Sequence, residues 1–338
     1  MDKPLVSICI PTYNRCKYLE SSLKKYIEEP EFQTGLVEIV ISDNASTDNT
    51  EILCRKYASE YSNIKYFRNT QNVRDKNFPL VLSKGNGLLH RLCNDTMQIH
   101  KGHLGDLCNL ARKYSVCKNK PFIFLYNQGF GQEIVCNDIN EFLYQVSFWI
   151  TWIGGLSLWH EECIDIEKDT ENCSTSLWQV GKICEVLHKK NKAIVFKKNF
   201  FVTPRIENKD VSYGFFKVHH DNLFSILNRY KGKNGINSDC LDWLEKDQLF
   251  NFFVPFQARR VLGIDKNLQY AKNDNLEISI NSYFQNKPYY GEYKKYYRKV
   301  MYKERCKAYI KKLVRWDKYN HSSMFRFFKN IYQIIFQG

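Results

Sequence analysis

Apolar runs alternate with amphipathic stretches over the first two hundred residues. Strands are predicted where β-branched and other apolar side chains follow one another, at 6–10, 37–42, 64–67, 88–93, 122–126 and 193–197. Helices are predicted where apolar positions recur every three or four residues, at 17–29, 48–61, 75–82, 103–114 and 174–190. Because parallel neighbours need crossover helices, this order predicts an α/β fold with a doubly wound, Rossmann-like sheet.

Two later regions need a separate interpretation. Residues 142–159 hold no charged side chain, a length near the lower limit for a transmembrane helix. They include Gln145, Thr151 and Gly154, whose polar and backbone groups would be costly in lipid, so we interpret the segment as buried strand and loop. After residue 204 the strand patterns fade, and helices are predicted at 213–230 and 239–253.

The 338-residue chain has a formal net charge of +14, which indicates an anionic partner. Residues 287–338 contain fourteen Lys and Arg against three Asp and Glu, a net +11, so the remaining residues carry only +3. The twelve cysteines are scattered, no Cys-x-x-Cys pair occurs, and the N-terminus leads directly into a strand. We therefore expect a reduced, cytoplasmic protein without a structural zinc site.

The basic tail is also aromatic and follows helical spacing. Its apolar positions are Tyr293, Tyr297, Val300 and Met301, then Tyr309, Leu313 and Trp316, then Met324, Phe327, Phe328, Ile331 and Ile335. Basic helices with aromatic faces suit the interface of an anionic membrane. The same faces could instead pack on the protein body or form a homodimer. Nucleic-acid binding is a third interpretation, and it rests on charge alone.

Ligands of doubly wound sheets bind beyond the carboxyl ends of the strands, so the residues after each strand were searched for chemistry. The first strand is followed by Pro11-Thr12-Tyr13-Asn14-Arg15, and the second by Asp43-Asn44-Ala45-Ser46-Thr47-Asp48. Asp43 is the strongest candidate, because a carboxylate at a strand end can accept a base N–H or a ribose hydroxyl. Asp48 stands three residues before Glu51, so it also suits a helix N-cap.

Together these segments, residues 6–15 and 38–48, resemble the opening of family 2 glycosyltransferases with the GT-A fold. The likeness is nearest to abequosyltransferase-like enzymes that build bacterial surface polysaccharides; it is clear over residues 4–110 and vague to 205. It implies a GT-A domain over 1–205, with a donor-nucleotide half at 1–110 and an acceptor half at 111–205. A helical region at 206–286 and the basic tail would follow as a C-terminal extension.

The resemblance also implies a nucleotide-sugar site. Its predicted donor-binding residues are Pro11, Thr12, Tyr13, Arg15, Asp43, Asn44, Asp48, Arg74, Asn94 and Asp95. Arg74, in the turn at 72–77, would meet a phosphate, or that turn is simply solvated.

The family's Asp-x-Asp-type metal cluster is reduced here to Asn94-Asp95-Thr96. Asp95 is the candidate ligand for Mn²⁺ or Mg²⁺, a weakened site because such cations favour several oxygen ligands. Alternatively, Lys or Arg neutralises the diphosphate, or activity is lost.

An inverting transfer needs a general base for the acceptor hydroxyl. The position of the family's catalytic base corresponds here to Cys173-Ser174, and neither residue is a plausible general base. The nearest carboxylates, Glu171 and then Asp169, are therefore the candidates. Acceptor-binding residues are predicted in the stretch at 152–160, namely Trp152, Gly155, Trp159 and His160. Indole faces stack on sugars and glycine permits close backbone approach, although core packing explains tryptophans as well.

The sequence thus predicts an enzyme at the inner face of the cell membrane. It would move a sugar from a nucleotide-sugar to a saccharide acceptor. A UDP-sugar is the first donor expected. A polyprenyl-linked acceptor lying in the membrane surface would suit the tail. The alternative is a catalytically degenerate protein of the same fold that only binds a nucleotide-sugar. Nucleic acid is not the expected partner.

Overall fold

The computed structural model describes residues 3–204, 206, 209–211, 213–264, 268–270 and 275–320. The chain forms two compact units: Met1–Arg205 with Val218–Leu241, and Ile206–Lys217 with Asp242–Gly338. This division differs from the predicted one. The helical region at 206–286 is shared between the units, and the tail belongs to the second unit. The predicted amphipathic stretch at 324–335 lies outside the described residues.

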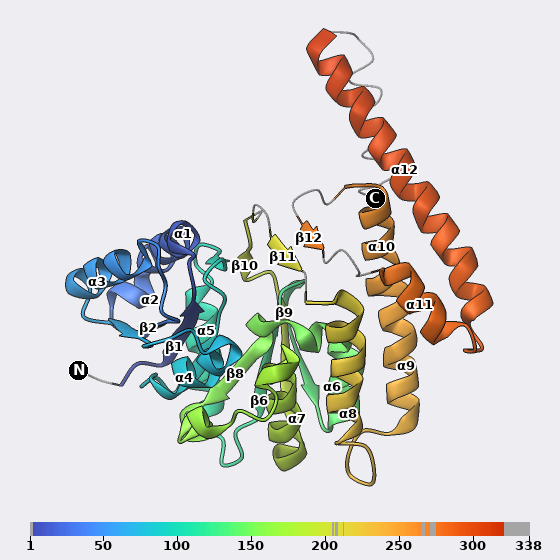
Figure 1. Ribbon diagram of the computed structural model, residues 1–338. Helices are drawn as coiled ribbons and strands as arrows, with labels where there is room; N and C mark the ends of the chain where they lie inside the picture. Colours follow the sequence, from blue (N-terminus) through green and yellow to red (C-terminus); the bar gives the residue numbers. More distant parts are fainter. Residues whose placement is uncertain are drawn as a thin grey trace. The chain divides into compact units, whose positions relative to one another are not determined.

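An eight-stranded sheet forms the centre of the first unit (Figure 1), in the order β3-β2-β1-β4-β8-β6-β9-β7. Its strands are β1 (Val6–Thr12), β2 (Val37–Asp43), β3 (Ile64–Arg68), β4 (Leu89–Leu92), β6 (Phe122–Tyr126), β7 (Phe130–Cys136), β8 (Leu156–Trp159) and β9 (Ala193–Lys198). All six predicted strands are present. Strands β7 and β8 were not predicted, and both run antiparallel to their neighbours, so the sheet is mixed.

The first half of the sheet is wholly parallel. Strand β1 pairs in parallel with β2 and β4, and β2 pairs in parallel with β3. Every residue of β1 and β2 is buried, as expected for strands covered by helices on both faces. These four strands therefore end at one edge, called here the carboxyl edge. Thr12, Asp43, Arg68 and the residues after Leu92 all lie there.

The first unit's helices are close to those predicted. They are α1 (Cys16–Ile27), α2 (Pro30–Gln33), α3 (Thr50–Glu60), α4 (Asn77–Ser83), α5 (Leu104–Ser115), α6 (Ile139–Val146), α7 (Trp178–Lys190) and α8 (Leu223–Asn228). Leu19, Leu23 and Tyr26 form the buried stripe of α1. Two predicted helices start later than expected, because 3₁₀ turns precede them: η1 (Arg74–Lys76) before α4, and η6 (Cys173–Thr175) before α7.

Residues 147–159 of the uncharged segment are loop and strand, as interpreted from its polar residues, whereas residues 142–146 belong to α6. The segment runs from the end of α6 through the 3₁₀ turns η2 (Ser147–Thr151) and η3 (Ile153–Gly155) into β8. Strand β8 lies between β4 and β6 in the middle of the sheet, which explains its lack of charge. In the described part of the chain no helix combines the length and apolarity that a membrane crossing needs.

The remaining strands form two small sheets, β5 (Gln98–Ile99) with β10 (Phe201–Val202), and β11 (Lys209–Val211) with β12 (Leu268–Tyr270). The helices after residue 237 are α9 (Ser238–Gln248), the π-helical turn η8 (Leu249–Phe253), α10 (Val254–Val261), α11 (Leu276–Phe284) and α12 (Tyr290–Asn320). Tyr293 of α12 is buried in a core with Phe253 and Phe284, and Tyr297 and Val300 pack against it. This apolar face of the tail thus packs within its own unit, so it does not provide the membrane-facing surface.

Candidate active site

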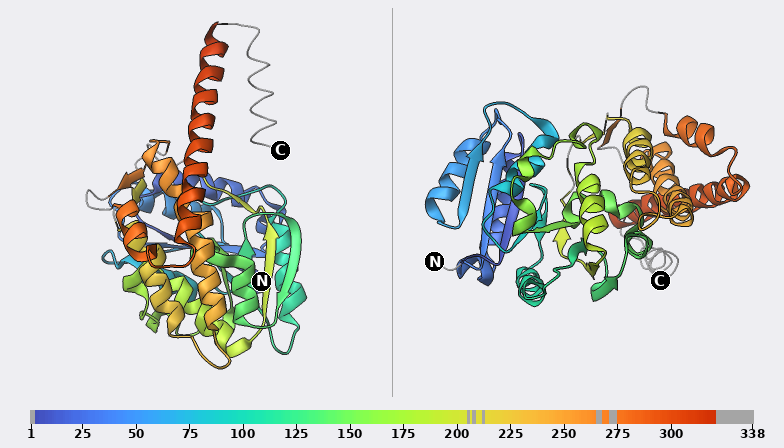
Figure 2. Two further views of the ribbon diagram at one scale, coloured as in Figure 1. Left: turned by 90° about the vertical axis from the view of Figure 1, so that its right-hand side faces the viewer. Right: turned by 90° about the horizontal axis from the view of Figure 1, so that it is seen from below.

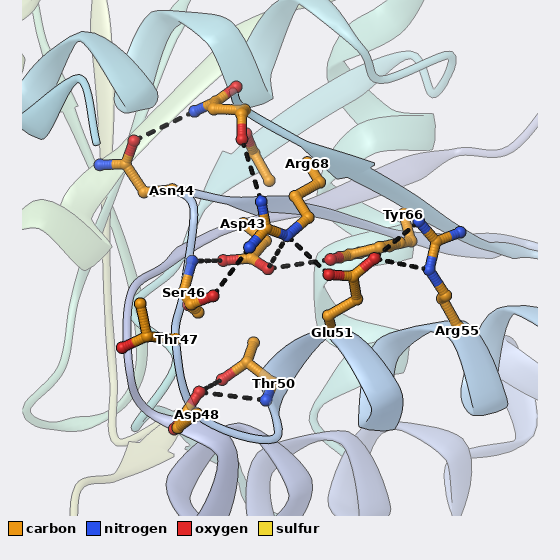
Figure 3. A network of polar contacts seen from close by, with 12 residues as sticks. Asp43, Asn44, Ser46, Thr47, Asp48, Thr50, Glu51, Arg55, Tyr66 and Arg68 are labelled. Atoms are coloured by element: carbon orange, nitrogen blue, oxygen red, sulfur yellow. Dashed lines mark hydrogen bonds and ion pairs between the residues drawn. The ribbon is translucent and has the colours of Figure 1, made fainter. Parts of the chain in front are cut away.

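The turn after β2 is built around the carboxylate of Asp43 (Figure 3). One oxygen accepts a hydrogen bond from the Ser46 backbone N–H at 2.9 Å, and the other accepts one from the Tyr66 hydroxyl at 2.8 Å. The Arg68 guanidinium Nε lies 3.7 Å from the second oxygen. Burial and the bond to Asp43 raise the pKa of Tyr66, which keeps that hydroxyl a donor. Because Asp43 is 0% exposed, its described contacts fix the turn. Direct contact of Asp43 with a base stays a prediction.

Asn44 ties this turn to the segment after β3. Its amide nitrogen donates to Asn72 Oδ1 at 2.8 Å, and its amide oxygen accepts from the Val73 backbone N–H at 2.8 Å. A second tie comes from Asn77, whose amide nitrogen donates to the Ser42 carbonyl at 2.9 Å. The turn at 72–77 is therefore held at the carboxyl edge, as the sequence predicted. Asn44 was predicted as a donor-binding residue, whereas Asn72 and Asn77 entered the prediction only as the bounds of this turn.

Asp48 joins the starts of two helices. Its carboxylate accepts from the backbone N–H of Cys16 at 3.1 Å and from that of Thr50 at 3.0 Å. Burial alone would raise the pKa of Asp48, but the hydrogen bonds from Thr50 and Cys16 outweigh burial and lower it. These contacts agree with the structural interpretation of Asp48. Its contact with a donor stays a prediction.

Asp95 lies at the carboxyl edge directly beside the loop after β1. The Thr12 hydroxyl donates to an Asp95 carboxylate oxygen at 2.9 Å, and the Ser22 hydroxyl donates to the Asp95 carbonyl at 2.8 Å. Asp95 is only 9% exposed. Burial raises the pKa of its carboxyl to about 6, although Arg15 and Thr12 act in the opposite direction. The structure thus brings together three predicted donor-site residues, Thr12, Arg15 and Asp95.

This cluster fits a divalent cation only in part. Within the described ranges no three His, Cys, Asp or Glu side chains come together in a geometry that could hold a metal. Asp95 supplies one carboxylate, and its elevated pKa shows that no nearby group compensates its charge fully. A buried, under-compensated carboxylate is a suitable ligand for a hard cation. Oxygens of a bound diphosphate would have to complete the coordination.

The other predicted donor residues lie along the same edge. Pro11 is buried within β1, whereas Tyr13 is exposed in the loop that follows. Asn94 is half-buried, and its backbone N–H points to the Met97 sulfur at 3.4 Å. Arg74 is exposed and has a positive φ of 52° at the start of η1. The structure leaves the side chains of Tyr13 and Arg74 accessible, and their contacts with a donor stay predictions.

Two predicted acceptor residues are corrected. Trp159 is 0% exposed, and its indole N–H donates to the Pro121 carbonyl at 2.8 Å. It is a core residue with no face available to a sugar. His160 follows antiparallel β8, so its backbone N–H bonds to Leu88, which precedes β4, at the edge opposite Asp95. There it lines a different hollow, of about 1040 Å³, with residues such as Lys3.

Gly155 also serves packing rather than an acceptor, because an added Cβ would lie 2.2 Å from the Phe124 ring. Trp152 differs. It is half-buried, and a Cβ on Gly154 would lie 2.5 Å from its indole and 2.6 Å from the Met97 methyl group. The Trp152 ring thus lies beside Met97, two residues after Asp95. Trp152 stays the predicted acceptor contact.

Arg91 supports the backbone of this stretch and was missed from the sequence. It is fully buried in β4, and its guanidinium donates to the Leu156 carbonyl and to the Ser157 hydroxyl, both at 2.8 Å. It also bonds to the Gly154 carbonyl. The available signal was an arginine beside His90 inside the 88–93 run, whose other residues are apolar.

The two predicted base candidates are both engaged in ion pairs. Asp169 lies 3.5 Å from the Lys182 ammonium, and Glu171, which is exposed, pairs with Arg229. Both precede η6 in the loop that leads to α7. A base role for either one stays a prediction, and each would have to leave its cation to accept a proton.

Known proteins resemble the N-terminal part of this chain. Residues 7–78, which include β1, β2 and the turn at 72–77, match the family Glycosyl transferase family 2. This N-terminal region is similar to glycosyltransferase family 2, and the match covers residues 7–78 of the 338. The chain is 45% identical over 85 residues to Abequosyltransferase RfbV of Salmonella typhimurium. It is 33% identical over 85 residues to a GalNAc(5)-diNAcBac-PP-undecaprenol beta-1,3-glucosyltransferase of Campylobacter jejuni. Each alignment spans a quarter of this chain and a quarter of the relative.

Solved structures extend the likeness of the family 2 region to the whole fold. S. aureus TarS 1-349 has a TM-score of 0.53 at 16% identity, over 89% of this chain and 91% of TarS. The mannosyltransferase PcManGT of Pyrobaculum calidifontis, solved with GDP-Man and Mn²⁺, has a TM-score of 0.51 at 15% identity, over 90% and 87% of the two chains. At these identities the likeness concerns fold alone. The predicted GT-A fold with a helical C-terminal extension is confirmed.

Proposed function

We propose that the protein is an inverting glycosyltransferase that uses a nucleoside-diphosphate sugar and a saccharide acceptor. The observation that carries this proposal is the buried carboxylate of Asp95 beside Thr12 and Arg15 at the carboxyl edge of a family 2 domain. Two similar proteins suggest which donor and acceptor classes to test. TarS was solved with UDP-GlcNAc, so a UDP-sugar is the first donor to test. The name of the Campylobacter relative contains an undecaprenol-linked saccharide, and we propose a lipid-linked acceptor.

In the proposed reaction the acceptor oxygen attacks the anomeric carbon from the face opposite the diphosphate. The new carbon–oxygen bond forms as the bond to the diphosphate breaks, and the diphosphate leaves with that electron pair. Arg15, beside Asp95, is placed to stabilise the leaving negative charge. Asp95, together with diphosphate oxygens, would hold Mn²⁺ or Mg²⁺. The cation would neutralise charge on the leaving group.

A catalytically degenerate, nucleotide-sugar-binding protein is the second candidate. Two observations favour it: the single carboxylate in Asn94-Asp95-Thr96, and the absence of any carboxylate from residues 172 to 178, directly before and at the start of α7. Such a protein would bind a donor but would never release nucleoside diphosphate from it. Turnover of a bound donor therefore separates the two candidates.

A thermal-shift panel of UDP-, CDP-, GDP- and dTDP-sugars, each with and without Mn²⁺, tests the proposed donor class. We expect one nucleotide class to raise the melting temperature by several degrees at a hundredfold excess over its dissociation constant. Release of nucleoside diphosphate from the same donor is then measured. The proposal is refuted if no nucleotide-sugar binds, and binding without release in the presence of glycolipid acceptors would favour the degenerate protein.

The second unit offers a surface for an anionic membrane, which is the predicted partner of the tail. Helix α12 extends beyond α10 and α11 of the same unit (Figure 2). The face opposite its buried Tyr293 and Met301 carries exposed tyrosines and basic side chains at helical spacing. Its members are Lys295, Arg298, Lys299, Tyr302, Arg305 and Tyr309. Tyr302 and Tyr309 are 73% and 64% exposed, so both rings are available to a membrane interface. We propose that this face lies on the membrane that contains the acceptor.

Co-sedimentation with vesicles of phosphatidylglycerol and phosphatidylcholine tests this surface. Each basic side chain near an anionic surface contributes about 1 kcal/mol. Changing Lys295, Arg298, Lys299 and Arg305 to glutamine is therefore expected to lower vesicle binding at least tenfold at low salt. A matched variant changes Lys56, Lys84, Arg112 and Lys118, four exposed basic residues of the first unit. Equal losses in both variants would show a general charge effect and contradict the proposed face.

A further inference from the structure

Asp75 is a further carboxylate at the carboxyl edge. It lies in η1, between the turn that Asn44 holds and the start of α4. Its side chain is half-buried, and no hydrogen bond or ion pair to it is found in the described part of the chain. The other carboxylates singled out in this region each have a described contact: Asp43 and Asp95 with hydroxyl groups, and Asp169 and Glu171 with cations.

The topology brings Asp75 to the turn before α7, which lies in the predicted acceptor half. Helix α4 follows parallel strand β3, so its preceding turn η1 lies at the carboxyl edge. Strands β4 and β6 are both antiparallel to β8, so they run in the same direction. Strand β9, which follows α7, is parallel to β6. The turn before α7, η6, therefore lies at the same edge. The two turns η1 and η6 contact each other.

The facing segment supplies no base of its own. Residues 172–178 contain no carboxylate and no histidine. Burial, and after it the charge of Asp75, raise the pKa of the Cys173 thiol to about 11, so this thiol is neutral near pH 7. The effect of Asp75 on Cys173 also shows that the two side chains are close together.

We propose that Asp75 is the general base of the sugar transfer. The inference rests on the proposed function and assigns the general base that residues 172–178 do not supply. The acceptor hydroxyl donates its proton to an Asp75 oxygen as its own oxygen bonds to the anomeric carbon. The carbon–oxygen bond to the diphosphate breaks in the same step, and the nucleoside diphosphate departs with the electron pair. No oxidant or further reactant is needed.

The electrostatics of Asp75 agree with this role. Burial raises the pKa of its carboxyl to about 6, and Arg74 on the same turn acts against that rise. The other titratable groups here are Lys76 on η1, and Cys173 and Asp169 on the facing side. Helix α4 contributes no charged side chain. Asp75 would then be ionised at pH 7 and still basic enough to take a proton.

The test compares Asp75→Asn with the wild-type full chain in release of nucleoside diphosphate from UDP-GlcNAc and from whichever nucleotide-sugar binds in the panel. Water replaces the unidentified acceptor. A general base contributes 100-fold or more, so we expect release to fall by about that factor while donor affinity stays within error and the melting temperature does not fall. The wild-type rate should rise with pH through about 6, and this rise should vanish in the variant. Asp75→Glu should restore part of the rate.

Controls separate this inference from the function that it rests on. Asp165→Asn, an exposed aspartate paired with Lys168 on the loop that leads to η6, should leave the rate unchanged. An unaltered rate and pH profile in Asp75→Asn would overturn the base assignment alone. If the rise of the rate with pH disappears only in Asp169→Asn or Glu171→Gln, the base is one of those residues and the assignment of Asp75 is overturned. If the rise disappears only in Asp95→Asn, the assignment is overturned in favour of Asp95. If the wild-type protein releases nothing from a donor that it binds, either to water or in the presence of glycolipid acceptors, both the inference and the proposed catalysis are overturned.

Discussion

Asp95→Asn is expected to stabilise the fold at pH 7.5 while abolishing sugar transfer. Burial raises the pKa of Asp95 to about 6, so ionisation of this carboxyl above that pH opposes folding. A difference of about two pKa units from an unfolded aspartate corresponds to about 3 kcal/mol. The isosteric amide carries no charge and still accepts from Thr12. We therefore expect a gain of about 2 kcal/mol in the free energy of unfolding and a loss of at least 100-fold in donor turnover.

The sign of this effect depends on pH in a defined way. The unfolded carboxyl loses its proton near pH 4 and the folded one near pH 6, so wild-type stability falls as pH rises through this window. Urea unfolding at pH 4.5 and 7.5, in EDTA, should show little difference between Asp95→Asn and wild type at the lower pH and the full gain at the higher. Asp48→Asn is the matched control. Hydrogen bonds lower the pKa of Asp48, so its replacement should destabilise. A destabilised Asp95→Asn at pH 7.5 would contradict the argument.

Asp43→Ala is expected to destabilise the first unit and to weaken nucleotide binding. The carboxylate satisfies the Ser46 N–H and the Tyr66 hydroxyl and lies beside the Arg68 guanidinium, all within a buried turn. Removing one partner of a buried, charged network leaves the others unsatisfied, at a cost of about 3 kcal/mol. Because the turn at 43–48 borders the predicted nucleotide pocket, we expect affinity for the nucleotide found in the panel to fall at least tenfold.

Urea unfolding and isothermal titration of the nucleotide measure the two effects of Asp43→Ala separately. Asp43→Asn retains an acceptor for the Ser46 N–H, so it should recover part of the stability. Glu51→Ala, which removes a surface partner of Arg68, is the control and should cost less than about 1 kcal/mol. Wild-type stability in Asp43→Ala would contradict the framework role of this carboxylate.

The parallel half of the fold could be predicted from the sequence because its signals are local. Fully buried strands such as β1 and β2 appear as continuous apolar runs, and the amphipathic helices between them imply parallel crossovers. Strand β7 was missed because six of its seven residues are exposed or half-buried, which removes the apolar pattern. Strand β8 was not separated from its uncharged surroundings. Its pairing between β4 and β6 depends on contacts far apart in the sequence.

Donor-site residues could be predicted because they follow the parallel strands, whereas acceptor-site residues could not be predicted in this way. Thr12 and Asp95 are 83 positions apart, yet both were predicted as donor-site residues, Thr12 from its place after the first strand and Asp95 from the resemblance to the family's Asp-x-Asp cluster. Trp159 and His160 were assigned to the acceptor because an indole or imidazole has the same chemistry in a core as in a pocket. Only the direction of β8 shows that His160 lies at the opposite edge.

The sequence by itself determined the alternation of buried strands and helices, the carboxyl edge at which polar residues gather, and the single carboxylate at 94–96. These properties follow from side chains acting on their chain neighbours. The tertiary structure decided which carboxylates are free and which are already paired. Asp43 and Asp48 have hydrogen-bond donors around them, and the charge of Asp95 is only partly balanced by its neighbours. Asp75 has no described hydrogen bond or ion pair and lies beside a segment that contains no base. Burial and pairing depend on groups brought together by folding, so a linear pattern cannot specify them.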